Sequence, residues 1–214
     1  MRRALFELLI PSACPACDAP RGEGDSILCM TCRVGLEPWP RLGAIHTAIA
    51  YRGTGRRLVQ RFKFEGRRAA LDVLLDSFVL RLRELDFSVI VPIPRHRDRL
   101  REQRADPVHT LAARLAEKLG RPVVDVLERT RLTRLQSELR PDERRQNVAG
   151  SFSIREGKLA GVSVLLLDDI ATTGATLMSA AEILRGQGRA RRVECAALAG
   201  TPPIPLSSSG RAAL

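Results

Sequence analysis

Two adjacent carboxylates, Asp168 and Asp169, lie between a short apolar run and a loop rich in hydroxyl groups. The run Val162–Leu167 suits a central strand of a parallel sheet that helices cover on both faces. After Thr172–Gly174 a helical pattern begins near Ala175. A strand, a tight loop and a helix N-terminus in this order can hold a phosphate, because backbone amides and the helix dipole favour an anion. Carboxylates at the end of the strand suit ribose hydroxyls or hydrated magnesium.

The loop does not match the common nucleotide-binding templates G-x-x-x-x-G-K-[ST] and G-x-G-x-x-G. Its pattern of an apolar strand, two acids and then Thr-Thr-Gly-x-Thr resembles the signature of type I phosphoribosyltransferases. The alternative is a structural junction without a ligand, but two ionised acids at the end of a buried strand need partners. The resemblance implies that Asp168 and Asp169 are catalytic or substrate-orienting and contact ribose or magnesium. It also implies a 5′-phosphate loop, formed by Ala171, Thr172, Thr173, Gly174, Ala175 and Thr176.

Four cysteines near the N-terminus form two C-x-x-C pairs, Cys14 with Cys17 and Cys29 with Cys32. Each pair can place two thiolates on one side of a tetrahedral ion, and a ligand set of four sulfurs indicates structural zinc. Two disulfides are the alternative, although no other feature indicates export. Cys195 stands alone in an apolar stretch and is expected to be an ordinary buried residue.

The composition indicates a domain of ordinary size with a small appendage and an aliphatic core. The chain has 214 residues, 44% of them hydrophobic and 4% aromatic, and a net charge of +11 from 32 Arg and 3 Lys against 24 acids. Such an excess of basic residues favours polyanionic partners such as phosphates or nucleic acid. No apolar run approaches the ~18 residues of a membrane span. We therefore expect a cytoplasmic protein without a membrane span.

Two further basic segments could contact ligands. The segment Arg56–Phe64 is predicted to be a helix that either binds nucleic acid or presents a solvated basic face over buried Phe62 and Phe64. The apolar run Ser88–Pro94 predicts a second buried strand, and the loop that begins at Arg95 is basic enough to hold a pyrophosphate.

The remaining pattern indicates an α/β fold. We expect helices at Arg68–Leu85, Pro107–Leu119 and Ala175–Leu184, and further strands at Ile45–Tyr51, Val123–Leu127 and Val193–Leu198. The Arg-rich segment Thr130–Asn147 is either a mobile flap over the site or contains a surface helix around Pro141–Asn147. We place an N-terminal helix and the cysteine knuckle in residues 1–40, the parallel-sheet domain in 41–200, and a disordered tail in 201–214.

The order of motifs along the chain resembles the ComF family of bacterial competence proteins. The motifs are the four-cysteine knuckle, Lys63-Phe64-Glu65-Gly66, Val91-Pro92-Ile93-Pro94, Gln136, the Arg144–Phe152 segment and the Asp168–Thr176 signature. The resemblance implies an N-terminal zinc finger joined to a type I phosphoribosyltransferase domain. One segment departs from the family, because Arg104 is followed by Ala-Asp-Pro-Val where the family has Gly-Phe-Asn-Gln. Arg104 is kept as a candidate phosphate-binding residue together with Arg95.

Two functions follow from these patterns. The first is an enzyme that binds phosphoribosyl pyrophosphate, or a nucleotide, with Mg²⁺ and transfers phosphoribose to a base. The second is a non-catalytic accessory factor that binds single-stranded DNA and works with other DNA-uptake proteins during natural transformation, as the family resemblance implies. Structural zinc is expected in either case.

Overall fold

The fold is described from a computed structural model, which covers residues 13–21, 27–39, 41–95, 106–129, 151–155 and 159–202. Several sequence predictions lie outside these ranges, namely the N-terminal helix, Arg104, the Arg-rich segment Thr130–Asn147 and the tail beyond residue 202. Within the described ranges, no helix is both long enough and apolar enough to cross a membrane.

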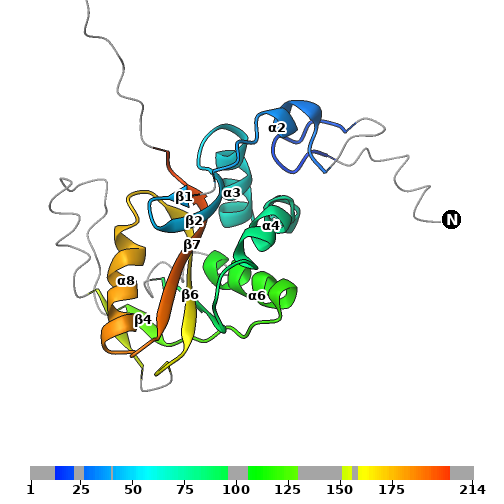
Figure 1. Ribbon diagram of the computed structural model, residues 1–214. Helices are drawn as coiled ribbons and strands as arrows, with labels where there is room; N and C mark the ends of the chain where they lie inside the picture. Colours follow the sequence, from blue (N-terminus) through cyan, green and yellow to red (C-terminus); the bar gives the residue numbers. More distant parts are fainter. Residues whose placement is uncertain are drawn as a thin grey trace, which may run out of the picture.

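A mostly parallel five-stranded sheet forms the centre of the molecule, as the sequence predicts (Figure 1). Its strand order is β1-β2-β7-β6-β3, with only β1 antiparallel to its neighbour. The strands are β1 (Arg41–Leu42), β2 (Ile45–Ala50), β3 (Val89–Pro92), β6 (Ser163–Ala171) and β7 (Arg192–Gly200). β6 is an inner strand, between β7 and β3, and both of its faces are covered, so its apolar residues need not alternate with polar ones.

Helices cover both faces of the sheet. On one face lie α3 (Gly53–Glu65), α4 (Arg68–Leu82) and α6 (Pro107–Leu119), and on the other lies α8 (Ala175–Gly186) (Figure 1). Leu165 and Leu167 of β6 pack in the cluster with the first group, whereas Val164 and Leu166 pack in the cluster with α8. This alternation follows from the two-residue period of a strand.

The helix Pro107–Leu119 has the predicted bounds, whereas the strand predicted at Val123–Leu127 is wrong. Val123 makes only an isolated bridge with Ile90 of β3. The chain then leaves the sheet, and β4 (Leu127–Arg129) pairs antiparallel with β5 (Phe152–Ile154) in a separate two-stranded sheet. The apolar pattern identifies residues that need burial, but it does not say which strand will pair with them.

The cysteine knuckle packs directly on α3. Its short helix α2 (Met30–Val34) follows Cys29, and Cys14 and Cys32 are buried in the same cluster as the apolar side of α3. Asp18 forms ion pairs with two arginines of the neighbouring layer: Arg61 Nη1 lies 2.6 Å from Asp18 Oδ2, and Arg67 contacts the other oxygen. The Arg61 ion pair joins α3 to the knuckle, and the Arg67 ion pair joins the start of α4 to it. The domain division at residue 40 stays a prediction.

Close packing of α3 on β2 depends on Gly55. A Cβ atom there would lie 2.4 Å from the backbone oxygen of Ala50 and 2.8 Å from Ile49 Cδ1. We expect Gly55→Ala to lower the free energy of unfolding by about 1–3 kcal/mol, since backbone must move to relieve the overlap. Gly186→Ala is the matched control, because Gly186 is also helical and a Cβ there meets no atom within 4 Å. Equal denaturation midpoints for both variants would contradict this packing.

Candidate functional site

The predicted phosphate loop lies between the end of β6 and the start of α8. Gly174 caps α8 with φ 78°, a left-handed conformation that glycine adopts without strain. Thr172 and Thr173 are exposed at this junction, and the amide of Ala175 donates to Thr173 Oγ1 at 3.4 Å. The first turn of α8 therefore offers backbone amides beside exposed hydroxyls, which is an arrangement able to hold a phosphate.

The two acids lie within β6 and not after it, which corrects the expectation that the strand stops before Asp168. The strand continues to Ala171, because β7 runs alongside it and pairs Ala171 with Gly200. Asp168 is half-buried and Asp169 is buried. Adjacent residues of a strand point to opposite faces, so the two carboxylates meet different surroundings.

Asp169 is held by two cationic side chains of the same protein. Lys63 Nζ of α3 lies 2.5 Å from Asp169 Oδ2, and Arg95 Nη2, beyond β3, lies 3.3 Å from the same oxygen. The Lys63, Arg95 and Asp169 side chains are only 16%, 15% and 7% exposed. A buried carboxylate needs such partners to remain ionised.

Asp168 has a different electrostatic environment. Burial and the neighbouring charge of Asp169 raise the pKa of Asp168 to about 7, although the Asp169 amide, which donates to Asp168 Oδ1 at 2.8 Å, and the charges of Lys63 and Arg129 act in the opposite direction. The ionised form of Asp168 is therefore short of compensating positive charge or hydrogen-bond donors. A ligand that supplies either would be bound favourably.

A cavity of about 310 Å³ lies between the end of β3, α6 and the two-stranded β4–β5 sheet. Its polar lining includes Arg95, His109, Arg129 and Arg155. His109 Nε2 lies 3.3 Å from Asp125 Oδ1, and Arg155 pairs with Glu128. Arg95 lines this cavity and also contacts Asp169, so the cavity adjoins Asp169. The arginines of its lining provide positive charge.

Sequence reasoning missed the role of Lys63. The basic segment was interpreted as a nucleic-acid contact or a solvated face over two buried phenylalanines, but Lys63 is mostly buried, and Phe64 is 65% exposed whereas Phe62 is buried. The signal available was the Lys-Phe-Glu-Gly motif itself. It could not be assigned because nothing in the sequence shows that α3 ends next to β6. Arg104 lies outside the described residues.

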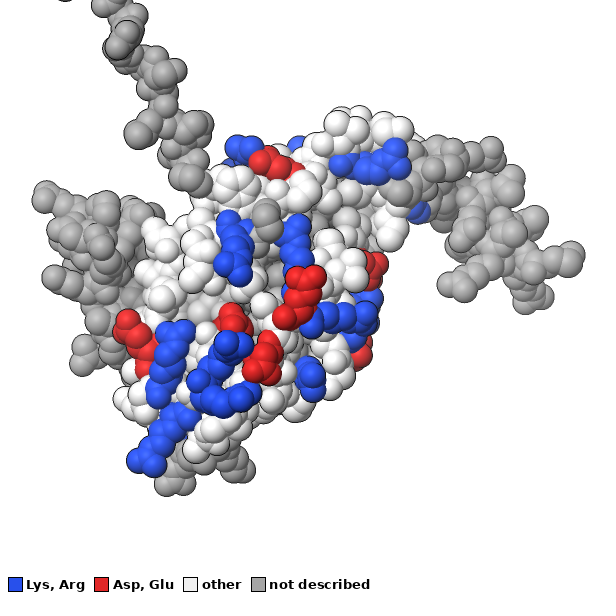
Figure 2. Space-filling model, viewed as in Figure 1, with Lys and Arg blue, Asp and Glu red and all other residues white. Residues whose placement is uncertain are grey.

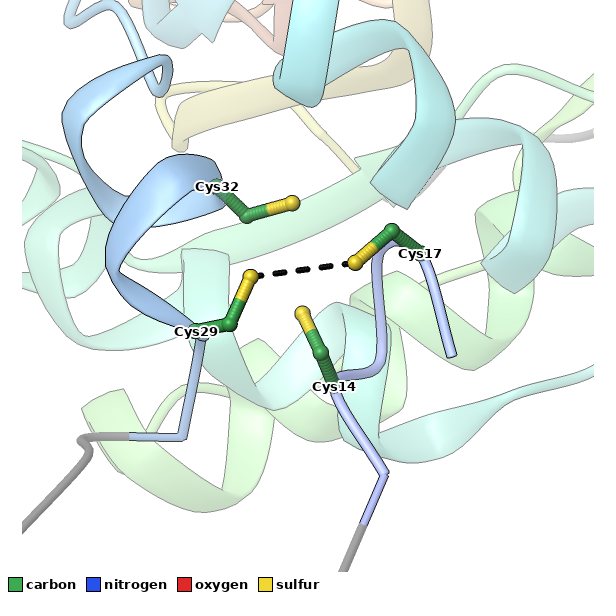
Figure 3. A group of neighbouring side chains, drawn as sticks. All are labelled: Cys14, Cys17, Cys29 and Cys32. Atoms are coloured by element: carbon green, nitrogen blue, oxygen red, sulfur yellow. Dashed lines mark hydrogen bonds between the residues drawn. The ribbon is translucent and has the colours of Figure 1, made fainter. Parts of the chain in front are cut away.

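The four cysteines converge at one point of the knuckle (Figure 3). Their sulfur atoms all lie within 4.8 Å of one another, and Cys17 Sγ is 3.7 Å from Cys29 Sγ. Sulfurs bound to one tetrahedral zinc at ~2.3 Å lie ~3.8 Å apart, whereas a disulfide needs ~2.05 Å. All four are free thiols, so the cluster has the donor set and spacing to hold a metal ion.

The thiols also differ in their readiness to ionise. Burial opposes ionisation of Cys14, but hydrogen bonds from the backbone at Cys29, Ala16 and Cys17 outweigh it and lower the pKa to about 6. The Ala19 backbone favours the Cys17 thiolate, yet burial and the other thiols raise the pKa of Cys17 to about 12. Arg57 Nη2 lies 3.7 Å from Cys32 Sγ. Several thiolates this close together need a cation.

Basic and acidic side chains are intermixed on the face shown in Figure 2, rather than separated into a positive stripe. Nine of the 32 arginines fall in residues 96–105 and 130–150, outside the described ranges. On this face, the described side chains therefore form no continuous basic path for a nucleic acid.

Comparison with known proteins agrees with this geometry. Residues 109–205 match the phosphoribosyl transferase domain family. The chain is 28% identical to competence protein ComFC of Bacillus subtilis over 197 residues, which cover 89% of this chain and 79% of that protein. It is also 28% identical to DNA utilization protein YhgH of Salmonella typhi, with 84% of this chain and 80% of that protein covered.

Solved structures similar to this chain include two phosphoribosyltransferases. Purine phosphoribosyltransferase from Pyrococcus horikoshii has a TM-score of 0.39 and 22% identity, over 63% of this chain and 77% of that one. Adenine phosphoribosyltransferase from Leishmania tarentolae has a TM-score of 0.40 and 19% identity, over 64% and 58%. The phosphoribosyl transferase domain match, the sheet topology and the clustered cysteines agree with the predicted fold class. The chain thus has a type I phosphoribosyltransferase fold with an N-terminal four-cysteine cluster, and its similarity to the ComF family of competence proteins is confirmed.

Proposed function

We propose that this protein binds phosphoribosyl pyrophosphate, or a nucleotide, at the carboxyl edge of the central strand. The observation that carries the proposal is the placement of Asp168 and Asp169 beside the exposed Thr172 and Thr173 and the N-terminus of α8. The phosphoribosyl transferase domain family matches this region. Ribose hydroxyls and a 5′-phosphate are the chemical groups that carboxylates and a helix N-terminus recognise.

Each chemical group of the ligand is matched to a part of the site by the charges and hydrogen-bond donors present there. The segment Ala171–Thr176 receives the 5′-phosphate through amides and hydroxyls. Asp168 accepts hydrogen bonds from ribose hydroxyls. Arg95 and the adjoining cavity receive the pyrophosphate, because its negative charge matches the arginines that line that cavity.

The donor set at the acids also fits a magnesium ion. Mg²⁺ prefers one or two carboxylates together with water and phosphate oxygens, and the half-buried Asp168 carboxylate is short of compensating charge. When bound, the ion would supply charge neutralisation for a pyrophosphate leaving group.

Transfer of phosphoribose is the activity proposed for this site. The bond between ribose C1 and the pyrophosphate oxygen breaks, and its pair of electrons leaves with pyrophosphate. A nitrogen lone pair of a base forms the new bond to C1, and the proton on that nitrogen passes to solvent. The carboxylates stabilise positive charge that develops on the ribose, and Arg95 stabilises the departing pyrophosphate. Little covalent participation by the protein is needed.

We further propose that the four cysteines bind one structural zinc. The sulfur spacing supports zinc, and a closed set of four thiolates leaves no open position for chemistry. A reducing compartment such as the cytoplasm is part of this proposal, because thiolate ligands are lost where disulfides form readily.

The direct test is a calorimetric titration of the zinc-loaded protein with phosphoribosyl pyrophosphate and Mg²⁺. Saturable binding with one site per chain would support the pocket and justify a screen of nitrogenous bases for pyrophosphate release. Absence of heat with a folded, zinc-loaded protein would refute the proposed ligand.

A DNA-uptake role is the second candidate, and the names of the relatives favour it: one is a competence protein and another a DNA utilization protein. If the basic chain, with its net charge of +11, binds single-stranded DNA, its affinity should fall by ~10²-fold or more between ~50 and ~200 mM salt, since phosphate contacts release counterions. Fluorescence anisotropy with a labelled oligonucleotide measures this. Affinity that does not change with salt would count against the role.

A further inference from the structure

Lys63 contacts Asp169 in the candidate site, and ligand binding alone does not explain this contact. Its ammonium nitrogen lies 2.5 Å from Asp169 Oδ2, closer than Arg95 Nη2 at 3.3 Å from the same atom. This is an intramolecular ion pair between a helix and the central strand, and it occupies a carboxylate oxygen that a divalent cation would otherwise use.

The scaffold fixes Lys63 in this position. It stands near the C-terminus of α3, which ends at Gly66 in the left-handed conformation with φ 67°. Two residues earlier, Arg61 pairs with Asp18 of the knuckle, and Gly55 docks the helix against β2. With its side chain only 16% exposed, Lys63 has little freedom to leave Asp169 for solvent.

The residue type is also informative. The chain contains 32 Arg and only 3 Lys, yet one of those lysines contacts Asp169. An ammonium is a compact charge that can approach a single carboxylate oxygen, whereas a guanidinium is a wide, planar fork. The ammonium of Lys63 is therefore small enough to take the place of a metal cation beside Asp169 Oδ2.

We infer that Lys63 is the resident counter-ion of Asp169 and competes with a bare divalent cation for the Asp169 carboxylate. The inference rests on the proposed function, in which the site takes a divalent cation together with a phosphorylated ligand. With Lys63 in place, the cation is admitted mainly with its anionic ligand, whose charge offsets the repulsion. Lys63 is thus a positioning residue that sets selectivity between the free metal and the metal–ligand complex.

The test uses Mn²⁺ as the probe, on the full-length zinc-loaded protein without any phosphoribosyl compound. Binding is followed by the loss of the paramagnetic resonance signal of free Mn²⁺. Lys63→Met should bind Mn²⁺ about 10-fold more tightly than wild type, because a repelling unit charge next to the site is removed. Adding Asp169→Asn to this variant should reverse the gain. Unchanged Mn²⁺ affinity in a folded Lys63→Met protein would overturn the inference.

Lys118→Met is the matched control. Lys118 Nζ also pairs with an aspartate, lying 2.9 Å from Asp76 Oδ1, but on the surface, where the two side chains are 38% and 79% exposed. Its removal should leave Mn²⁺ affinity unchanged. An equal gain in this variant would mean that net charge alone, and not the Asp169 contact, controls the metal.

A second measurement keeps the inference testable if Lys63→Met folds poorly. With three lysines in the chain, labelling their side-chain nitrogens gives three signals in wild-type protein, and Lys63→Arg identifies the one from Lys63. Saturating Mg²⁺ should shift that signal, because Lys63 must release Asp169 Oδ2. A Lys63 signal that does not move would contradict the competition. Neither readout uses phosphoribosyl pyrophosphate, so failure of the proposed function would be seen separately.

Discussion

Replacing Asp168 by Asn is expected to weaken phosphoribosyl pyrophosphate binding strongly while making the free protein more stable. In the proposed site Asp168 accepts hydrogen bonds from the ribose or binds the metal, and loss of charged hydrogen bonds should weaken binding by about 100-fold. Stability should rise at pH 8 by roughly 1–3 kcal/mol, because the folded state holds this ionised carboxylate at a cost that the amide avoids.

The sign of the stability effect follows from the direction of the pKa shift. The pKa of Asp168 is raised from 3.8 to about 7, so the folded state binds a proton that the unfolded state releases. The contribution of Asp168 to stability is therefore most favourable below pH 4 and is lost as the pH rises to about 7. The gain of Asp168→Asn over wild type should be larger at pH 8 than at pH 5, as measured by urea denaturation at both pH values.

The adjacent acid provides the contrast. Asp169→Asn leaves Lys63 and Arg95 buried without their carboxylate, so this variant should lose about 3–5 kcal/mol of stability. Opposite signs at neighbouring positions cannot arise from general disruption of β6. If Asp168→Asn destabilised the protein as much as Asp169→Asn, or if it bound the ligand like wild type, the assignment of the two acids would be wrong.

Removal of the proposed zinc is expected to have the second large effect. The purified protein should contain about one zinc per chain, and Cys17→Ser should lose it. Because Cys14 and Cys32 belong to the core cluster against α3, the loss should reach the main domain. A loss of ~5 kcal/mol would lower the midpoint of thermal unfolding by roughly 10–20 °C, at 2–4 °C per kcal/mol for a chain of this size.

Cys195→Ala is the control for this experiment. Cys195 is buried in β7, where burial raises its pKa to about 11, and it lies outside the four-cysteine cluster. The variant should match wild type in metal content, although a small cavity should lower its stability. Metal analysis and differential scanning calorimetry of both variants separate the two effects. Zinc retained by Cys17→Ser, or two disulfides in the isolated protein, would contradict the proposed metal site.

Local patterns were sufficient for much of the fold and for most of the candidate residues. The apolar run before Asp168 predicted a central strand, and Gly174 next to a helical pattern predicted the junction at which α8 begins. The two C-x-x-C pairs predicted a four-sulfur cluster. These features are encoded within a few consecutive residues, where period, turn chemistry and ligand spacing can be read directly.

The partners of those residues depend on contacts between distant segments. Strand pairing placed β4 with β5 instead of extending the main sheet at Val123. Packing of α3 brought Lys63 to Asp169, 106 positions further along the chain, and thereby gave two adjacent aspartates opposite electrostatic roles. The sequence alone determined which groups could do chemistry at the strand end. Only the tertiary structure decided which of them are already neutralised, because burial and long-range pairing set the electrostatics of a carboxylate.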